Sequence, residues 1–258
     1  MSEFGYGQFA YSYDSLTQNI DYQKRGAYFH EIMLQQGKTK GILVDLACGT
    51  GSLSEYFARL DYEVIGVDVS EEMLQMAQEK KLENGSDVLY LCQPMQELDL
   101  YGTVDIVLCA LDSLNHVTER ETVQQIFQRV SLFLNEDGLF VFDVNTVYKH
   151  QHVLANQTFV YDLDDIYCVW QNQLEQDNLV HITLDLFEYD PDGDCYDRYQ
   201  EEFKERAYSH EQLKGMLDAA DMDIVAVYGD DTFELPAETT QRAIYVCKNR
   251  FCKNRKAE

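Results

Sequence analysis

The segment Val44-Asp45-Leu46-Ala47-Cys48-Gly49-Thr50-Gly51 constrains the fold of this chain more than any other. The apolar residues of 42–46 indicate a buried strand, and the helical spacing of Leu53 and Phe57 indicates an amphipathic helix after it. Glycine at the junction permits positive φ and a close approach of a ligand to the backbone, while the first N–H groups of the helix lack partners inside it. The segment therefore predicts a strand, loop and helix that hold a small ligand.

A dinucleotide would use the same geometry, but its G-x-G-x-x-G pattern is incomplete here, because Ser54 stands at the third small position. Asp45 lies four positions before the first glycine and suits a ligand with positive charge better than a pyrophosphate. A nicotinamide oxidoreductase stays open at this point, because Asp68, at the end of the second expected strand, would bind ribose hydroxyls in either class of protein.

Three more segments follow the glycine loop in a fixed order. They are Val64–Ser70, which contains the acid Asp68, then Leu91–Met95, then Asp105–His116. Together with the loop they resemble the ordered motifs of class I S-adenosylmethionine-dependent methyltransferases over about residues 40–145.

The resemblance implies that S-adenosyl-L-methionine is the cofactor. It assigns the ribose hydroxyls to Asp68 and the adenine side to the segment after the third strand. Related proteins often carry an acid beside the methionine of that segment, where this chain has Pro94, so Gln93 or the backbone of Met95 must serve. The residues assigned to the cofactor are Asp45, Ala47, Gly49, Gly51, Asp68, Val69, Met73, Gln93, Met95, Cys109 and Leu111.

Strand and helix patterns alternate along most of the chain. Apolar runs predict strands at 41–47, 63–67, 88–92, 104–110 and 138–144, and helical spacing predicts helices at 52–60, 71–81 and 119–134. The pattern resumes after residue 208 with one helix and strands near 223–229 and 241–247. We expect an α/β fold with a doubly wound, mostly parallel seven-stranded sheet formed by residues 1–145 and 209–258, in which 1–38 form an N-terminal helical cap.

Residues 146–208 lack a helical period and predict an inserted antiparallel β-sheet lid. Ile182, Leu184 and Leu186 alternate with His181, Thr183, Asp185 and Phe187, and Asp192-Gly193 supplies a turn. An insertion at this place resembles small-molecule methyltransferases of the glycine and sarcosine type and of the amino-sugar N,N-dimethyl type. The N-terminal segment Phe9–Leu16 also resembles the opening of that group, which makes Tyr13 a candidate wall of the methyl-transfer site or, alternatively, part of a packing stripe.

The transfer of a methyl group to an amine requires a neutral nucleophile, and a nearby base with a pKa close to 7 would help. His116 is the candidate base, and Asp112 is an alternative that could hold a substrate ammonium. The competing interpretations are a helix N-cap region around His116 and a structural loop at Asp112. The candidate catalytic residues are therefore His116, Tyr13 and Asp112.

The net charge of −26 disfavours nucleic-acid substrates, because nucleic-acid affinity depends on basic residues that neutralise phosphates. The exception is a basic cluster at 248–256, which could contact RNA or an acidic partner; the simpler interpretation is a solvated end that solubilises the terminus. Seven cysteines without a C-x-x-C pair argue against disulfides and a zinc site, and we expect no metal; Cys48, Cys92 and Cys109 should be small buried core residues. Without a signal peptide or a membrane-spanning run, a cytoplasmic protein is expected, and a homodimer stays open.

These patterns predict an S-adenosylmethionine-dependent methyltransferase acting on a small molecule, with an amine as the favoured acceptor. Residues 146–208 contain 14 acidic and 4 basic residues interleaved with 11 aromatic ones, and both carboxylates and aromatic faces attract cations. The alternatives are O-methylation, an RNA or protein target, or a non-catalytic cofactor-binding protein on this fold.

Overall fold

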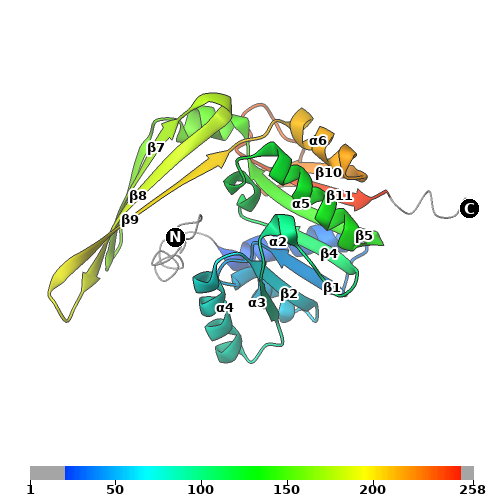
Figure 1. Ribbon diagram of the computed structural model, residues 1–258, viewed down its shortest axis with the longest axis horizontal. Helices are drawn as coiled ribbons and strands as arrows, with labels where there is room; N and C mark the ends of the chain where they lie inside the picture. The colour runs from blue at the N-terminus through cyan, green and yellow to red at the C-terminus, as the bar shows by residue number, and fades with distance from the viewer. Residues whose placement is uncertain (1–20, 251–258) are drawn as a thin grey trace, which may run out of the picture.

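The protein consists of a helix-covered sheet and a second, smaller sheet that reaches away from it (Figure 1). The computed structural model describes residues 21–250. Tyr13, the segment Phe9–Leu16 and most of the basic cluster lie outside the described residues, so the interpretations placed on them stay predictions.

The main sheet confirms the expected fold. Its seven strands run in the order β10-β11-β5-β4-β1-β2-β3, with β11 antiparallel to both of its neighbours and the other inner pairs parallel. The chain order reverses at β1, whose neighbours are β4 and β2. The strands are β1 (Ile42–Leu46), β2 (Glu63–Asp68), β3 (Leu89–Cys92), β4 (Val104–Cys109), β5 (Leu134–Asn145), β10 (Met222–Gly229) and β11 (Arg242–Asn249).

Helices cover both faces of this sheet. The helices α2 (Tyr22–Gln35), α3 (Ser52–Ala58) and α4 (Glu71–Asn84) pack on one face, and α5 (Arg120–Phe133) and α6 (His210–Ala219) pack on the other. The helices α2, α4 and α6 begin at a residue whose side chain accepts from a free N–H group of the first turn; in α4, the Ser70 hydroxyl accepts from Met73 N at 3.2 Å. The helices α3 and α5 begin without such a side-chain cap. The apolar stripe of α5 is fully buried, as its spacing predicts; it comprises Val123, Ile126, Phe127 and Val130.

The boundary between α5 and β5 differs from the prediction. The helix ends at Phe133, and Leu134 already starts β5, which is longer at its N-terminal end than the expected 138–144. The pairing register of β5 with β4 shifts between Val104 and Ile106, so an irregular piece of strand precedes the regular one. The apolar spacing of Leu134 fits a helix and a strand equally well, which is why the pattern misplaced it.

The second sheet lies within residues 146–208 and is antiparallel throughout. We call it the lid sheet. The predicted alternation is correct: Ile182, Leu184 and Leu186 are buried, and the residues between them are not. The turn with Asp192-Gly193 joins its two longest strands at the end farthest from the main body (Figure 1). Its strands are β6 (Thr158–Asp162), β7 (Ile166–Leu174), β8 (Leu179–Asp190) and β9 (Cys195–Arg206).

Two expectations about local structure are wrong. Residues 146–208 do contain helical turns, a π-helix at Lys149–Leu154 and a short 3₁₀ turn at Gln176–Asn178, both too short to produce a visible period. Cys92 is exposed, because it ends the edge strand β3, and Cys48 is only half-buried, whereas Cys109 is buried as expected.

The lid sheet is tied to the main body where β9 ends. The Asn115 amide donates to the carbonyls of Asn145 and Arg206, at 3.1 and 2.9 Å. The Arg206 guanidinium in turn donates to the carbonyl of Thr118 at 2.6 Å. These bonds join the last residues of β9 to the loop after β4, so the lid sheet is anchored beside the carboxyl ends of the central strands.

Gly51 is held by both its backbone conformation and its neighbours, and its substitution should be costly. It has φ of +76°, and a Cβ there would lie 2.4 Å from the hydroxyl of Tyr90 and 3.0 Å from Ala77. Gly85 has φ of +65° with nothing within 4 Å. We expect Gly51→Ala to lower the free energy of unfolding by about 2–4 kcal/mol and Gly85→Ala by about 1 kcal/mol, because only the first adds steric overlap to backbone strain.

Urea unfolding of both variants measures this difference. Repeating Gly51→Ala in a Tyr90→Phe background, which removes the nearest atom, should recover part of the loss. Equal costs for the two glycines would contradict the packing explanation.

Candidate functional site

A cavity of ≈ 530 Å³ opens at the carboxyl ends of β1, β2 and β4. This is the point where the strand order reverses, and ligands of open α/β sheets bind there because the connecting loops diverge. Its lining comes from the loop after β1, the end of β2, the segments after β3 and β4, and one stretch of β9 in the lid sheet. Both sheets therefore contribute to one cavity.

The glycine loop and the end of β2 are joined by a carboxylate. Asp68, the last residue of β2, accepts from Gly49 N at 2.8 Å through one oxygen and from Ser70 N at 2.9 Å through the other. A carboxylate can accept about four hydrogen bonds, so this one retains capacity for a ligand. Gly49 has φ of +53°, and a Cβ placed there would meet nothing within 4 Å, so the loop backbone borders open space.

Asp45 lies beneath the loop and is nearly fully buried. The hydroxyl of Ser54 donates to its carboxylate at 2.6 Å. Burial raises the pKa of Asp45 to about 6, although the Ser54 bond favours the charged form and limits the rise. Ser54, which interrupts the dinucleotide pattern, is therefore the residue that donates a hydrogen bond to Asp45, the acid before the glycine loop.

Eight of the eleven residues predicted to bind the cofactor line the cavity: Asp45, Ala47, Gly49, Asp68, Val69, Met73, Met95 and Leu111. The other three lie outside the lining. Gly51 packs against Tyr90, and Cys109 is buried beside the sulfur of Met95 at 4.0 Å. Gln93 bonds to the backbone of Asp99, where its side chain closes a turn, and Pro94 and Gln96 line the cavity beside Met95 instead.

The environment of Asp112 differs from the one expected of a residue that binds a substrate ammonium. Its carboxylate accepts from Arg242 at 2.7 Å and from the Asn145 amide at 2.8 Å, and it is absent from the lining of the cavity. Arg242 also bonds to the buried Asp143. Burial would raise the pKa of Asp112, but the positive charges of Arg242 and Lys149 outweigh it and hold the pKa well below its usual range. The structural-loop interpretation therefore fits its contacts better.

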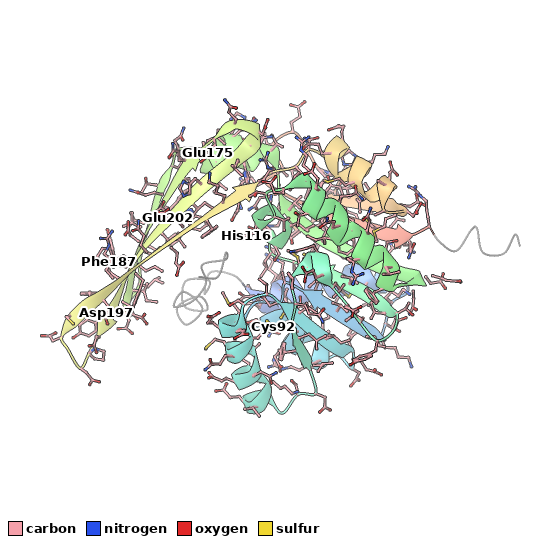
Figure 2. The ribbon with its side chains drawn as sticks, in the orientation of Figure 1. Cys92, His116, Glu175, Phe187, Asp197 and Glu202 are labelled. Atoms are coloured by element: carbon pink, nitrogen blue, oxygen red, sulfur yellow. The ribbon has the colours of Figure 1, made fainter. Side chains whose placement is uncertain are left out.

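His116 lines the cavity from a short 3₁₀ helix, η2 (Ser113–His116), after β4. Its side chain is 27% exposed, and its Nε2 lies 3.6 Å from the Glu205 carboxylate of β9. The ring packs against Phe203 with 5.3 Å between centroids. Figure 2 shows His116 on the body side of the lid strand that carries Glu202. The N-cap interpretation is not supported, because α5 begins with Glu119 as its N-cap.

Sequence reasoning missed the lid residues of the cavity. Glu202, Phe203 and Lys204 line it, and their neighbour Glu205 contacts His116 from behind. Tyr22, at the start of α2, also lines it. These residues lie far in the sequence from every cofactor motif. Only the strand alternation around the turn at Asp192-Gly193 could have indicated which of the lid side chains share a face of the sheet.

Comparisons with known proteins agree with this geometry. A family model described as a methyltransferase domain matches residues 43–138. A protein of Geobacillus sp. (strain WCH70), named "Putative methyltransferase GWCH70_2453", is 34% identical over 94% of this chain and 99% of its own length. The crystal structure of an S-adenosylmethionine-dependent methyltransferase from Clostridium acetobutylicum is 33% identical, covers 94% of this chain and 98% of its own, and superposes with a TM-score of 0.86.

The chain belongs to the S-adenosylmethionine-dependent methyltransferases. Its cofactor is S-adenosylmethionine, so the nicotinamide alternative is excluded. A more distant fold neighbour is CalS10 from Micromonospora echinaspora, an amino pentose methyltransferase solved with the cofactor bound; it is 16% identical, with a TM-score of 0.74 over 93% of this chain and 96% of its own. The open loop at Gly49 and the remaining acceptor capacity of Asp68 fit the cofactor of this methyltransferase family.

The Asp68 carboxylate should carry a large part of cofactor affinity. We expect Asp68→Ala to weaken binding of S-adenosylmethionine by about 1.5–3 kcal/mol, the range for hydrogen bonds to a charged group. Gln93→Ala is the control and should leave affinity within twofold, because the Gln93 side chain bonds to the backbone of Asp99 and does not line the cavity. Calorimetric titration measures both; equal losses for the two variants would contradict the assignment of Asp68.

The buried carboxyl of Asp45 should make stability depend on pH. Because burial raises its pKa above the unfolded value, its stabilising contribution is present at low pH and is lost as pH rises through about 6. Asp45→Asn keeps an acceptor for Ser54 and cannot ionise. Relative to the native protein, this variant should gain about 1–1.5 kcal/mol in free energy of unfolding between pH 5 and pH 7.5.

Urea unfolding without cofactor at several pH values tests this expectation. Asp61→Asn, which removes an exposed carboxyl, controls for the change in net charge. A difference from the native protein that is independent of pH would show that Asp45 does not titrate in this window.

Proposed function

We propose that this methyltransferase transfers a methyl group to the nitrogen of a small-molecule amine. The observation that carries the proposal is the composition of the cavity, which runs from the glycine loop and Asp68 past His116 to Glu202 and Phe203 of the lid sheet. A cofactor bound at the loop and an acceptor bound under the lid would then meet beside His116.

The lid end of the cavity favours a cation. Glu119 and Glu202 contribute carboxylates there and Phe203 contributes an aromatic ring, against the single basic residue Lys204, which is paired with Glu175 at 2.9 Å. Carboxylates and aromatic faces both attract an ammonium group. The net charge of −26 acts in the same direction at long range and disfavours nucleic acids, so we propose a small-molecule acceptor.

The chemistry places two demands on the protein. When bound, S-adenosylmethionine supplies an electrophilic methyl carbon on a sulfonium sulfur. The acceptor amine must then be held in line and be neutral when it attacks. His116 is the side chain that we assign to accept the amine proton, because it lines the cavity between the loop and the lid. We assign to Asp112 the role of holding the loop through Arg242, and Tyr13 stays a candidate wall of the site.

The fold neighbour CalS10 supports an amine acceptor, because an amino pentose methyltransferase shares the fold over 93% of this chain. At 16% identity this support is limited to the fold. A panel of acceptors therefore has to decide between nitrogen and oxygen.

The panel should contain matched pairs that differ only in the reacting group, such as glucosamine with glucose and cyclohexylamine with cyclohexanol, together with phenols and carboxylic acids. Formation of adenosylhomocysteine and the mass of the product report turnover. We expect methylated products from amines and none from their hydroxyl counterparts. Methylation confined to phenols, alcohols or acids would overturn the amine proposal and leave the family assignment intact.

A charge-removing pair of variants tests the role of the lid end. Glu202→Gln removes a carboxylate at the cavity, and Asp197→Asn removes one from the same strand far from it (Figure 2). With an amine substrate, we expect Glu202→Gln to raise KM about 5–20-fold, the value of roughly 1–2 kcal/mol for one charged contact, and Asp197→Asn to leave it unchanged. Equal KM values for both variants would show that Glu202 does not contact the ammonium.

A further inference from the structure

A second acid, Glu205, lies behind His116 and is almost completely inaccessible. It is the penultimate residue of β9, its side chain is 6% exposed, and it is not part of the cavity lining. Its Oε1 lies 3.6 Å from Nε2 of His116, and its Oε2 lies 3.8 Å from Nε2 of His150. The carboxyl group therefore stands between two imidazole rings, one of which faces the cavity.

The two histidines differ in the charge that they can take. His150 is fully buried in the π-helix, and its Nδ1 lies 3.0 Å from the carbonyl oxygen of Asn178, so Nδ1 carries the proton of that bond. Within the described part of the chain, its Nε2 has no hydrogen-bond partner. Burial lowers the pKa of His150 to about 4, so this ring stays neutral. His116 is partly exposed, so of the two rings it is the one able to take a positive charge.

The other charged groups around Glu205 and His116 have hydrogen-bond or ionic partners of their own. Asp112 is neutralised by Arg242, and Lys149 donates to Asn145 at 2.8 Å and faces Asp112, Asp143 and Arg242 as well as Glu205. Asp68 faces His116 from the end of β2, where it accepts two backbone hydrogen bonds. Burial raises the pKa of Glu205, against the positive charges of His116 and Lys149. A positive charge on His116 would thus offset the cost of a buried carboxylate.

We propose that Glu205 is the positioning residue for His116, orienting its ring toward the acceptor and stabilising the imidazolium that forms when His116 takes the proton of the amine. The proposal rests on the proposed function of His116 as base. In the step, the N–H bond of the substrate breaks and its electron pair stays on nitrogen, while an N–H bond forms on the imidazole. The ring then carries a positive charge beside the negative charge of Glu205, and the proton later leaves to solvent from the partly exposed ring.

The geometry distinguishes Glu205 from the other acids nearby. Glu202 has a side chain that is 56% exposed and pairs with His181, at 3.6 Å, and Asp112 is held by Arg242. A carboxylate that is shielded from water and within reach of Nε2 can orient the ring and stabilise a positive charge on it better than a solvated carboxylate can. Because Glu205 comes from the lid sheet, His116 would be competent only when β9 is docked on the loop after β4.

The ionisation of His116 tests this directly and needs no substrate. Glu205→Gln keeps the shape and removes the charge, and Glu201→Gln is the matched control on the same face of β9, four residues away. In protein with ¹⁵N-labelled histidine, we expect an NMR titration to show the pKa of His116 lowered by about one unit or more in Glu205→Gln and unchanged in Glu201→Gln. Glu205→Asp should restore part of the shift. An unchanged pKa of His116 in Glu205→Gln would overturn the proposal.

Turnover of an amine substrate provides the second readout. With Glu205→Gln we expect kcat to fall about 10–100-fold with cofactor affinity unchanged, and the acidic limb of the pH profile to move to lower pH. Thermal unfolding and cofactor titration show whether the variant is folded. If it is not, Glu205→Asp, which moves the charge away from Nε2, should lower the pKa of His116 and kcat by smaller amounts, and no change in either would overturn the proposal. If the pKa of His116 changes in Glu205→Gln but the protein methylates no amine, the pairing of Glu205 with His116 holds and the proposed function is rejected. If the protein methylates amines but the pKa of His116 is unchanged, the proposed function holds and the role of Glu205 is rejected.

Discussion

The guanidinium of Arg242 bridges the carboxylates of Asp112 and Asp143 in the interior of the protein, and much of the site depends on this bridge. Asp143 is fully buried in β5, and a buried carboxylate without a partner would be strongly unfavourable. Arg242 begins β11, so the bridge joins that antiparallel strand to β5 and to the loop after β4. That loop continues into η2, which carries His116, so the position of the candidate base follows from the pairing of buried charges.

The attachment of the lid sheet continues the same network. Asn145, at the end of β5, donates to Asp112, and its backbone N–H donates to Asn115 at 2.9 Å. Asn115 in turn holds the carbonyl of Arg206, where β9 ends. A chain of hydrogen bonds thus runs from the core of the main sheet to the lid sheet, and every buried amide in it has a partner. This attachment explains how residues of an inserted sheet come to line the cavity of the main body.

Three acids near the cavity illustrate how environment decides the state of a carboxyl group. Asp45 has few partners, and burial raises its pKa to about 6. Asp112 is partly buried, but adjacent positive charges lower its pKa. Glu205 lies between these cases, because burial raises its pKa while His116 and Lys149 oppose the rise. Residue type alone would have assigned all three the same ionisation behaviour. Asp112 does carry a charge, but its carboxylate pairs with Arg242 instead of a substrate ammonium.

The sequence by itself determined the succession of strands and helices in the cofactor half and the position of the glycine loop, and its resemblance to class I methyltransferases implied the cofactor. These are local properties: an apolar strand, a glycine that needs positive φ and an acid at the end of the next strand lie close together in the chain, so periodicity and spacing report them. It also indicated the alternating faces of β8. The tertiary structure alone decided that Gln93 turns to Asp99, that Asp112 pairs with Arg242, and that Glu202 and Glu205 approach His116. Those contacts join residues from distant parts of the chain or depend on which way a side chain turns, and they arise from how the two sheets pack, which no local pattern records.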